Sequence, residues 1–279
     1  MFEIFFLSAI ALIWIIFATF QDIKSREIAN WLNFSLIAFA IGFRFFYSLF
    51  SLGNFNFFYQ GILGLGIFLI LGNVLYYGRF FAGGDAKLLI SLGAVLSFSE
   101  SFYNNVQNFS FFLLIFLLVG ALYSIIISGV LCLKNYKKFK KEFGKQFLKN
   151  KKAVNVAIFI SLIFIILGFY ENLLFYLGIF TFLVPYLYFY AKAVDEVSMI
   201  KNQETSKLRE GDWLYRDVKV KGRTIKAKWD GLKKEEITLL RREKRKIMIR
   251  EGIPFTPVFL FSFIIFLYLW NKGLWYSFW

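Results

Sequence analysis

The chain has 279 residues, of which 58% are hydrophobic and 22% aromatic, and its formal net charge is +15. A soluble core of this length does not need so much apolar surface, so the composition is typical of a membrane protein. The chain has no histidine and a single cysteine, Cys132, which excludes Ser-His-Asp and Cys-His catalysis, a disulfide framework and a four-cysteine zinc site. Any hydrolytic chemistry must therefore use carboxylates, lysine or hydroxyl groups, and we expect no metal and no cofactor.

Eight apolar runs follow one another along the chain. A helical membrane span needs about 20 apolar residues, with a range of about 17 to 25, and most of the runs qualify. The fourth run is short and predicts a partial or broken span, while the sixth and seventh lie so close together that they predict a tight helical hairpin. The runs cover residues 3–20, 31–52, 57–77, 86–98, 109–133, 153–169, 172–191 and 254–271.

The positive charges fall on one side of the membrane if the N-terminus is placed outside. The inner loops then hold 31 of the 33 lysines and arginines, and the outer loops hold none. This distribution follows the positive-inside rule, so we predict a multi-pass protein of the cell membrane. The two exceptions are Lys272 in the tail and Arg44, which we expect to snorkel to the outer surface. The inner loops are 21–30, 78–87, 134–152 and 192–253, and the outer loops are 53–56, 99–108 and 170–171.

The net charge is therefore mostly a matter of topology, and we expect no nucleic acid partner because no nucleic-acid-binding module accompanies it. The basic loop 134–152 has Phe139, Phe143 and Phe147 four residues apart, which would form one apolar stripe on a helix. Two interpretations remain open for this loop. It lies as a helix on anionic membrane lipids, or it is a solvated basic loop.

These observations predict an all-α polytopic membrane bundle of six to eight transmembrane helices with a small cytoplasmic α+β lobe. We assign residues 1–191 to the membrane domain, 192–253 to the lobe and 254–279 to the final transmembrane helix. Within the lobe, residues 213–229 alternate apolar and polar side chains around a Lys-Gly pair, which predicts a β-hairpin. Residues 233–251 carry acids early and bases late, which predicts a helix.

The chemistry-bearing residues are two aspartates at the inner face. Asp22 lies just past the first apolar run, and Asp85 opens the fourth. An aspartate at a membrane boundary is costly and uncommon, and these are the only two aspartates before position 195. Like charge and desolvation would raise the pKa of one of them, leaving one acid and one base. Such a dyad activates water for attack on a peptide carbonyl without a histidine or a metal.

Gly83 and Gly84 come directly before Asp85. Glycines allow backbone turns that are closed to other residues and let a substrate strand approach closely, and an unwound stretch at membrane depth is tolerated where it lines a wet cavity. The structural interpretation stays open beside the catalytic one. Asp85 would then only cap a helix, and Asp22 would be an ordinary residue of a charged turn.

The pattern of these residues resembles that of the type IV prepilin peptidases. In that family D-x-x-x-R-x-I-x-N-x-L follows a first span, and G-x-G-D-x-K-L-L opens a later one. The ending of the archaeal branch, which includes the preflagellin peptidases, resembles residues 250–260. The matching positions in this chain are Asp22, Arg26, Ile28, Asn30 and Leu32, then Gly84, Asp85, Lys87, Leu88 and Leu89.

The resemblance implies a membrane aspartic endopeptidase with Asp22 and Asp85 as its catalytic pair. Its substrates would be prepilins or pre-archaellins, which carry a short basic leader before an apolar helix, and cleavage would occur at the cytoplasmic face. Lys87 would place a positive charge near the site, or else extend its ammonium group to the membrane interface. Arg26 and Asn30 would shape the turn after Asp22.

Three features depart from the family pattern. Ala82 replaces the first glycine of G-x-G-D, and Ala29 replaces the usual proline before Asn30. The single cysteine means that the four-cysteine zinc region of many bacterial members is absent, which weakens any expectation of N-methyltransferase activity.

Other functions remain open alternatives. Presenilin-like proteases share the Gly-x-Gly-Asp motif, but their companion aspartate lies within a span and a Pro-Ala-Leu motif follows, which this chain lacks. A non-enzymatic membrane protein, such as a transporter or a pilus-assembly partner, would use the aspartate pair for ions or structure, and the short fourth run is compatible with the broken helices of transporters. For a Ser/Lys protease, the sequence offers no serine paired with a lysine at matching depth in a glycine-lined site.

Overall fold

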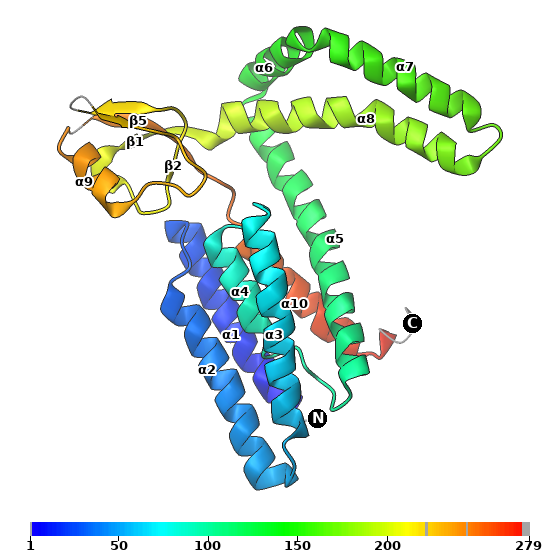
Figure 1. Cartoon of the computed structure of the whole chain (residues 1–279), viewed down its shortest axis with the longest axis vertical. Coiled ribbons are helices and arrows are strands. Elements are labelled where there is room, and N and C mark those ends of the chain that lie inside the picture. Colours follow the sequence, from blue (N-terminus) through cyan, green and yellow to red (C-terminus); the bar gives the residue numbers. More distant parts are fainter. Residues whose placement is uncertain (1, 221–222, 244, 275–279) are drawn as a thin grey trace. The chain divides into compact units, whose positions relative to one another are not determined.

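The computed structural model describes residues 2–220, 223–243 and 245–274. Its internal contacts divide the chain into two compact units. The first, which we call the bundle, comprises residues 1–124 together with 254–279, and the second, which we call the insert, comprises residues 125–253. The insert therefore interrupts the bundle between its fifth helix and its last one (Figure 1).

The bundle is built from long apolar helices. Apolar side chains surround these helices on all sides, which is the pattern expected where one face packs against protein and the other meets lipid. Their core is rich in aromatic and aliphatic side chains, among them Leu7, Leu89, Phe112, Phe259 and Phe263. The helices are α1 (Phe2–Ser25), α2 (Asn30–Tyr47) with a π-helical extension (Ser48–Leu52), α3 (Asn56–Tyr77), α4 (Gly83–Gly93), the first part of α5 (Phe102–Lys134) and α10 (Thr256–Asn271).

The prediction of a polytopic helical membrane protein with a small strand-containing lobe is confirmed. Among the described residues, five helices are long and apolar enough to cross a membrane, or six if the bent pair in the insert counts as one span. The helix α10 is a shorter apolar helix. Within the described part of the chain, eight continuous helical crossings are not found, since α4 has only 11 residues and α10 only 16.

The buried arginine Arg44 explains why the fourth run leaves the helical conformation. After α4 ends, the chain continues without regular structure through residues 94–98, so its carbonyl groups lack helical partners. The guanidinium of Arg44 donates to the carbonyl oxygens of Ala94, Val95 and Ser97 at 2.8–3.0 Å, and to that of Phe57 at 3.0 Å. Irregular backbone at membrane depth requires such internal partners.

The expectation that Arg44 snorkels to the outer surface is therefore wrong. Its side chain is completely buried and stacks on the ring of Phe57, with 4.2 Å between the guanidinium carbon and the ring centre. Gly61 on α3 makes room for it, because a Cβ atom at that position would collide with the aliphatic part of Arg44. The positive charge thus serves the fold of the bundle.

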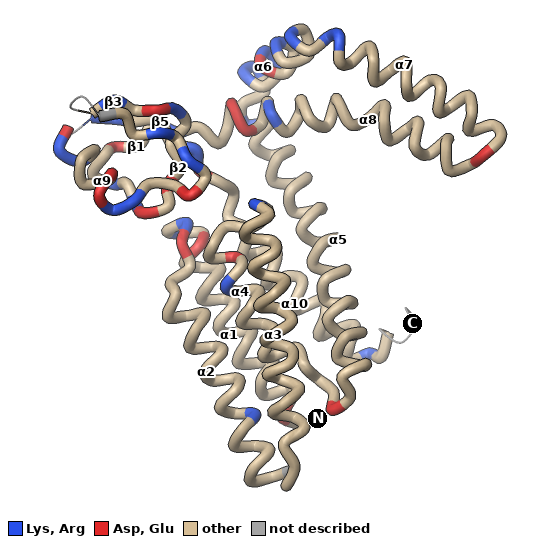
Figure 2. The backbone as a smooth tube through the Cα atoms, viewed as in Figure 1, with Lys and Arg blue, Asp and Glu red and all other residues tan. Residues whose placement is uncertain are grey.

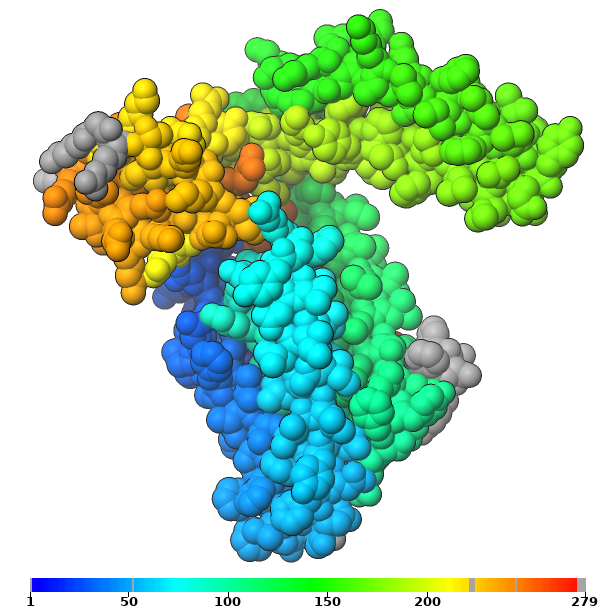
Figure 3. Space-filling model, in the orientation of Figure 1, coloured from blue at the N-terminus to red at the C-terminus, as the bar shows by residue number. Residues whose placement is uncertain are grey.

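The insert contains a helical hairpin after the second part of α5 and the helix α6 (Tyr136–Lys149). Helices α7 (Lys151–Leu167) and α8 (Asn172–Val194) run antiparallel, as the two neighbouring apolar runs predict (Figure 1). The space-filling view shows the two helices closed against each other along the hairpin (Figure 3). Gly178 permits this close approach, and Ser161 donates a 2.9 Å hydrogen bond to its carbonyl oxygen.

The basic loop forms the helix α6 (Tyr136–Lys149), and its phenylalanine stripe packs on protein. Phe139 contacts Tyr190 of α8 with 5.6 Å between ring centres, and Phe147 contacts Phe189 at 6.4 Å. The stripe therefore packs against α8 of the same unit, and the helical conformation contradicts the interpretation as a solvated loop, whereas the interpretation as a helix on anionic lipids stays a prediction. The lysine face of α6 is exposed.

The lobe of the insert contains two small sheets and one helix. The strand β5 (Lys246–Arg250) pairs antiparallel with β1 (Ile200–Glu204) and β2 (Trp213–Leu214). The predicted hairpin is present as β3 (Val218–Val220) and β4 (Arg223–Ile225), although its Lys-Gly turn lies outside the described residues. Short helical turns follow α8 (Asp195–Met199) and β1 (Thr205–Lys207).

The prediction of one helix over residues 233–251 is only half right. The helix α9 (Lys234–Arg241) forms its first half, with the Glu236 side chain accepting from the Lys233 backbone as a start signal. The second half is β5, whose Ile247 and Ile249 point into the lobe core. The alternation of apolar and charged residues in this half satisfies the strand period, and two neighbouring strands supply its hydrogen bonds.

Candidate active site

Asp22 lies in the last turn of α1 and is held by the first residue of α10. Its side chain is buried, and its Oδ2 atom accepts two hydrogen bonds from Thr256. The hydroxyl of Thr256 donates at 2.9 Å and its backbone N–H at 3.2 Å. Residues from the two ends of the sequence therefore meet at this carboxylate.

The turn after Asp22 is shaped by Arg26. This arginine adopts the left-handed conformation with φ of 59°, which is uncommon for a residue with a side chain, and its N–H donates to the Asp22 carbonyl oxygen at 2.8 Å. The side chain of Gln21 accepts from the N–H of Ala29 at 3.1 Å. These two hydrogen bonds close the turn, and the chain then enters α2 at Asn30.

Asp85 lies in the first turn of α4, which is not one of the candidate membrane spans. Ala82 precedes this helix in an extended conformation, with φ of −70° and ψ of 159°. Because any residue adopts such a conformation, alanine stands without strain where the family pattern has glycine. Asp85 does not occupy the capping position itself, since that position belongs to Ala82.

The two glycines before Asp85 do not have the predicted role. Gly83 and Gly84 belong to α4, and neither has a positive φ, so they do not form an unwound turn. A Cβ atom on Gly84 would lie 3.4 Å from the side chain of Ile28. This is an ordinary van der Waals distance, so the start of α4 lies against the turn that follows Asp22 without requiring a glycine at this position.

The charge of the Asp22 carboxylate acts on Asp85. Desolvation by the surrounding helices, followed by the neighbouring Asp22 carboxylate, raises the pKa of Asp85 from 3.8 to about 7, and the backbone of Ala82 works in the opposite direction. The Asp85 side chain keeps partial solvent exposure, so solvent reaches it. Two carboxyl groups that share one proton in this way supply one acid and one base.

Lys87 and Asn30 contact each other beside this pair. The ammonium group of Lys87 donates a 2.7 Å hydrogen bond to Oδ1 of Asn30. Lys87 lies on α4 two residues after Asp85, and Asn30 opens α2. This bond joins the helix that carries Asp85 to the turn that follows Asp22. Figure 2 shows that most charged residues of the bundle gather at this end.

Thr256 and Tyr123 are site residues that the sequence did not indicate. The hydroxyl of Tyr123 donates to the Pro254 carbonyl oxygen at 2.8 Å, and its ring lies within electrostatic reach of Asp22 and Arg26. A Thr-Pro pair at the start of the last apolar run is a recognisable helix-start signal. Its contact with Asp22, which lies 234 positions earlier in the sequence, is not indicated by the residues around Thr256.

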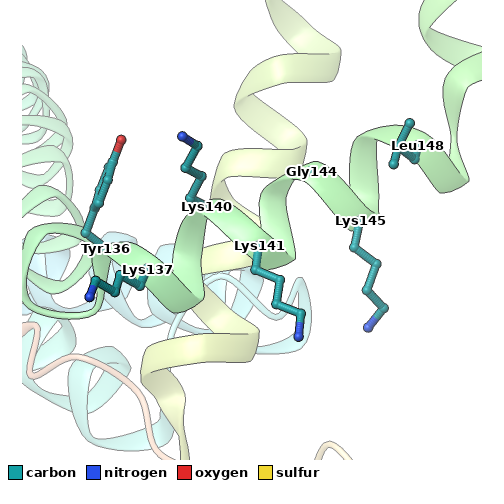
Figure 4. Close-up of a pocket in the computed structure, with 7 residues that line it drawn as sticks. All are labelled: Tyr136, Lys137, Lys140, Lys141, Gly144, Lys145 and Leu148. Atoms are coloured by element: carbon teal, nitrogen blue, oxygen red, sulfur yellow. The ribbon is translucent and has the colours of Figure 1, made fainter.

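A second feature with several charged side chains lies on α6. An open groove of about 740 Å³ is lined by residues of this one helix, four of them lysines, with Lys141 and Lys145 extending side by side (Figure 4). The lining contains no carboxylate, so it offers no acid–base pair. Among the described residues, no three Cys, Asp or Glu side chains gather closely enough to hold a metal ion. The groove residues are Tyr136, Lys137, Lys140, Lys141, Gly144, Lys145 and Leu148.

Comparisons with known proteins point to one family. Residues 9–132, which include Asp22 and Asp85, match the model of the type IV leader peptidase family. The chain is 30% identical to a preflagellin peptidase of Methanococcus maripaludis over 155 residues, covering 51% of this chain and 66% of that protein.

A second relative belongs to the same group. The chain is 33% identical to a preflagellin peptidase of Methanococcus voltae over 102 residues, covering 36% of this chain and 42% of that protein. The chain thus spans just under two thirds of the first relative and under half of the second. No solved structure matches the chain.

Proposed function

The chain belongs to the type IV leader peptidase family, and from this membership we propose that it is a membrane aspartic endopeptidase with Asp22 and Asp85 as its catalytic pair. The observation that carries the proposal is the electrostatic effect of Asp22 on Asp85, a carboxyl group with a pKa raised to about 7. Both residues lie in the segment that the family model matches. A pair of carboxylates is also an acid–base catalyst that remains available to a chain without histidine.

In the proposed reaction, a water molecule between the two carboxyl groups attacks the scissile peptide carbonyl. One carboxylate takes a proton from the water, and the other carboxyl group gives its proton to the carbonyl oxygen. The partial exposure of Asp85 allows water and an extended peptide to reach the pair. Lys87 and Asn30 link the starts of α4 and α2 beside the pair, and Arg26 closes the turn after Asp22.

We further propose that the substrates are prepilins or pre-archaellins with a short basic leader. The two relatives are both named preflagellin peptidases, which supports a precursor of this class. The positive-inside charge distribution of the sequence supports a position at the cytoplasmic face of the cell membrane for the end of the bundle that holds Asp22 and Asp85. A basic leader would remain on that side before cleavage.

The test is leader removal in membranes that contain this protein together with one precursor. Pre-archaellin and prepilin precursors are expressed separately, and the loss of the leader is followed by gel shift. We expect a shift for at least one precursor, and none for the same precursor with a proline directly after the cleavage point. Absence of cleavage for every precursor would overturn the proposal.

One observation favours a non-enzymatic alternative, in which the aspartates are structural. The Asp22 carboxylate caps α10 through Thr256, as a purely structural residue would. Under this alternative Asp22→Asn lowers the thermal stability of the protein and has no precursor-dependent consequence. Under our proposal Asp22→Asn abolishes cleavage while the protein remains inserted in the membrane.

A further inference from the structure

The contact between Thr256 and Asp22 bears on which of the two aspartates acts as the base and which as the acid. Both donors of Thr256 are directed at the same oxygen of Asp22. Thr256 is completely buried, and its carbonyl oxygen receives a long 3.5 Å contact from the Thr19 hydroxyl on α1. Two donors on one buried residue fix the position of a carboxylate more firmly than a single donor on a mobile side chain.

The sequence around Thr256 makes these donors available. As the first residue of α10, Thr256 has an N–H group with no partner inside its own helix. Pro257 follows it and has no N–H at all, and the Val258 N–H donates to the Phe255 carbonyl oxygen, so the backbone donor directed at Asp22 is that of Thr256. The hydroxyl adds a second donor that valine or alanine would lack.

Asp85 has a different environment. Of the two carboxyl groups, only Asp22 receives these two donors from Thr256, and charge-assisted hydrogen bonds of this kind favour a carboxylate. The desolvation and the Asp22 charge that act on Asp85 favour its protonated form. Tyr123 on α5 lies within electrostatic reach of both Asp22 and Arg26, which directly follows α1.

We propose that Thr256 is a positioning residue whose hydroxyl and backbone N–H hold the Asp22 carboxylate as the general base, leaving Asp85 as the general acid. This inference rests on the proposed function and assigns the two roles within it.

The assignment gives a balanced reaction. As the water oxygen bonds to the carbonyl carbon, one water proton passes to Asp22, and Asp85 protonates the carbonyl oxygen. Asp22 then gives its proton to the leaving nitrogen as the C–N bond breaks. Asp85 recovers a proton from one hydroxyl of the intermediate, and both groups return to their starting states.

The first experiment compares Thr256→Val with Thr256→Ser in the cleavage assay. Valine keeps the shape and the N–H but removes the hydroxyl, whereas serine keeps the hydroxyl. We expect kcat to fall about tenfold to a hundredfold in Thr256→Val, the range for a hydrogen bond to a charged group, with little change in KM. Thr256→Ser should restore most of the activity. Thr181→Val in α8, which removes a hydroxyl bonded within its own helix, is the matched control.

These outcomes separate the two proposals. A wild-type protein that cleaves no precursor overturns the proposed function. A wild-type protein that cleaves, together with a Thr256→Val variant of unchanged kcat, overturns only the role of Thr256. Loss of activity in Thr256→Val without recovery in Thr256→Ser also overturns it, because the hydroxyl would then not be the feature that matters.

A second measurement needs no variant and no cleavage. Dicyclohexylcarbodiimide reacts with protonated carboxyl groups, and peptide mass spectrometry locates the product. At neutral pH we expect the wild-type protein to be labelled at Asp85 faster than at Asp22. Labelling of Asp22 at the same rate or faster would overturn the assignment, even if Thr256→Val fails to fold.

Discussion

Lys87 donates a hydrogen bond of 2.7 Å to the side-chain oxygen of Asn30, and this bond joins α4 to the turn between α1 and α2. Lys87 lies two residues after Asp85, and Asn30 lies eight residues after Asp22. The bond therefore links the start of α4 to the start of α2, near the segments that carry the two proposed catalytic aspartates.

The Lys87–Asn30 bond can be tested with a double-mutant cycle. We expect Lys87→Met and Asn30→Leu each to lower the cleavage rate by less than about tenfold, corresponding to about 0.5–1.5 kcal/mol for one hydrogen bond. The double variant should be no worse than the more impaired single variant, because both changes remove the same contact. Fully additive losses would show that the two side chains act separately.

Replacement of either aspartate should abolish leader removal. Asp22→Asn and Asp85→Asn keep the size of the side chain but remove its acid–base function, and we expect each to lower the rate by about 10²–10⁴-fold. Gel shift of the precursor measures the loss, and membrane fractionation verifies insertion. Asp230→Asn, at an exposed position in the lobe, is the matched control. Retained cleavage in either site variant would contradict the proposed dyad.

Stability should depend on pH through Asp85. Its pKa is raised from 3.8 to about 7 in the folded protein, so the folded state binds more protons than the unfolded state within this window. The contribution is fully present below about pH 4 and is lost as the pH rises to about 7, with a slope of up to about 1.4 kcal/mol per pH unit.

Thermal unfolding in detergent at a series of pH values measures this effect. Wild type should lose stability across the window relative to Asp85→Asn, which cannot ionise there. Cleavage should also fall above about pH 7, where Asp85 gives up its proton. Parallel stability profiles for the two proteins would show that Asp85 does not titrate in this range.

Arg44 should be among the most costly residues to replace in the bundle. Arg44→Met leaves four carbonyl oxygens without the donors that now bind them. We expect a loss of about 3–5 kcal/mol, as for the removal of one partner from a buried charged network. Arg44→Lys should be intermediate, since an ammonium group cannot reach all four. Unfolding of Arg242→Met, at an exposed position, provides the comparison, and equal stability of the two methionine variants would contradict this role.

The lysine face of α6 should bind anionic lipid headgroups. Its phenylalanine face is occupied by α8, while Lys137, Lys140 and Lys141 are exposed and offer the charge that anionic headgroups attract. Changing these three lysines to glutamine should reduce the anionic phospholipid that copurifies with the protein, as measured by lipid mass spectrometry. The same change at three exposed lysines of the lobe, Lys207, Lys219 and Lys226, controls for net charge. Equal losses in both variants would exclude a specific role for α6.

The sequence indicates those features of the bundle that depend on local composition. Long apolar runs predict the spans, and the two adjacent runs predict the hairpin of α7 and α8. Asp22 and Asp85 are placed at the same inner face by charge topology alone. The structure adds the electrostatic effect of Asp22 on Asp85, which depends on how distant segments of the chain pack.

The features that the sequence does not reveal depend on distant partners. Arg44 looks like a snorkelling residue because the carbonyl groups that it binds belong to a stretch 50 positions away. Residues 246–250 fit a helix by charge pattern, but two strands on either side supply a better set of backbone partners. Thr256 shows no sign of its role until α10 is seen beside α1.

The hydrogen bond from Tyr123 to Pro254 has a topological consequence. Tyr123 immediately precedes the point where the chain leaves the bundle for the insert, and Pro254 is the residue at which the chain returns. The exit and the return are therefore held within the reach of one tyrosine side chain. An inserted segment whose two ends lie close together can be lengthened, shortened or removed without changing the path of the surrounding chain. A short bridge from Ser124 to Pro254 would thus close the bundle into a minimal protein that retains both aspartates and Thr256.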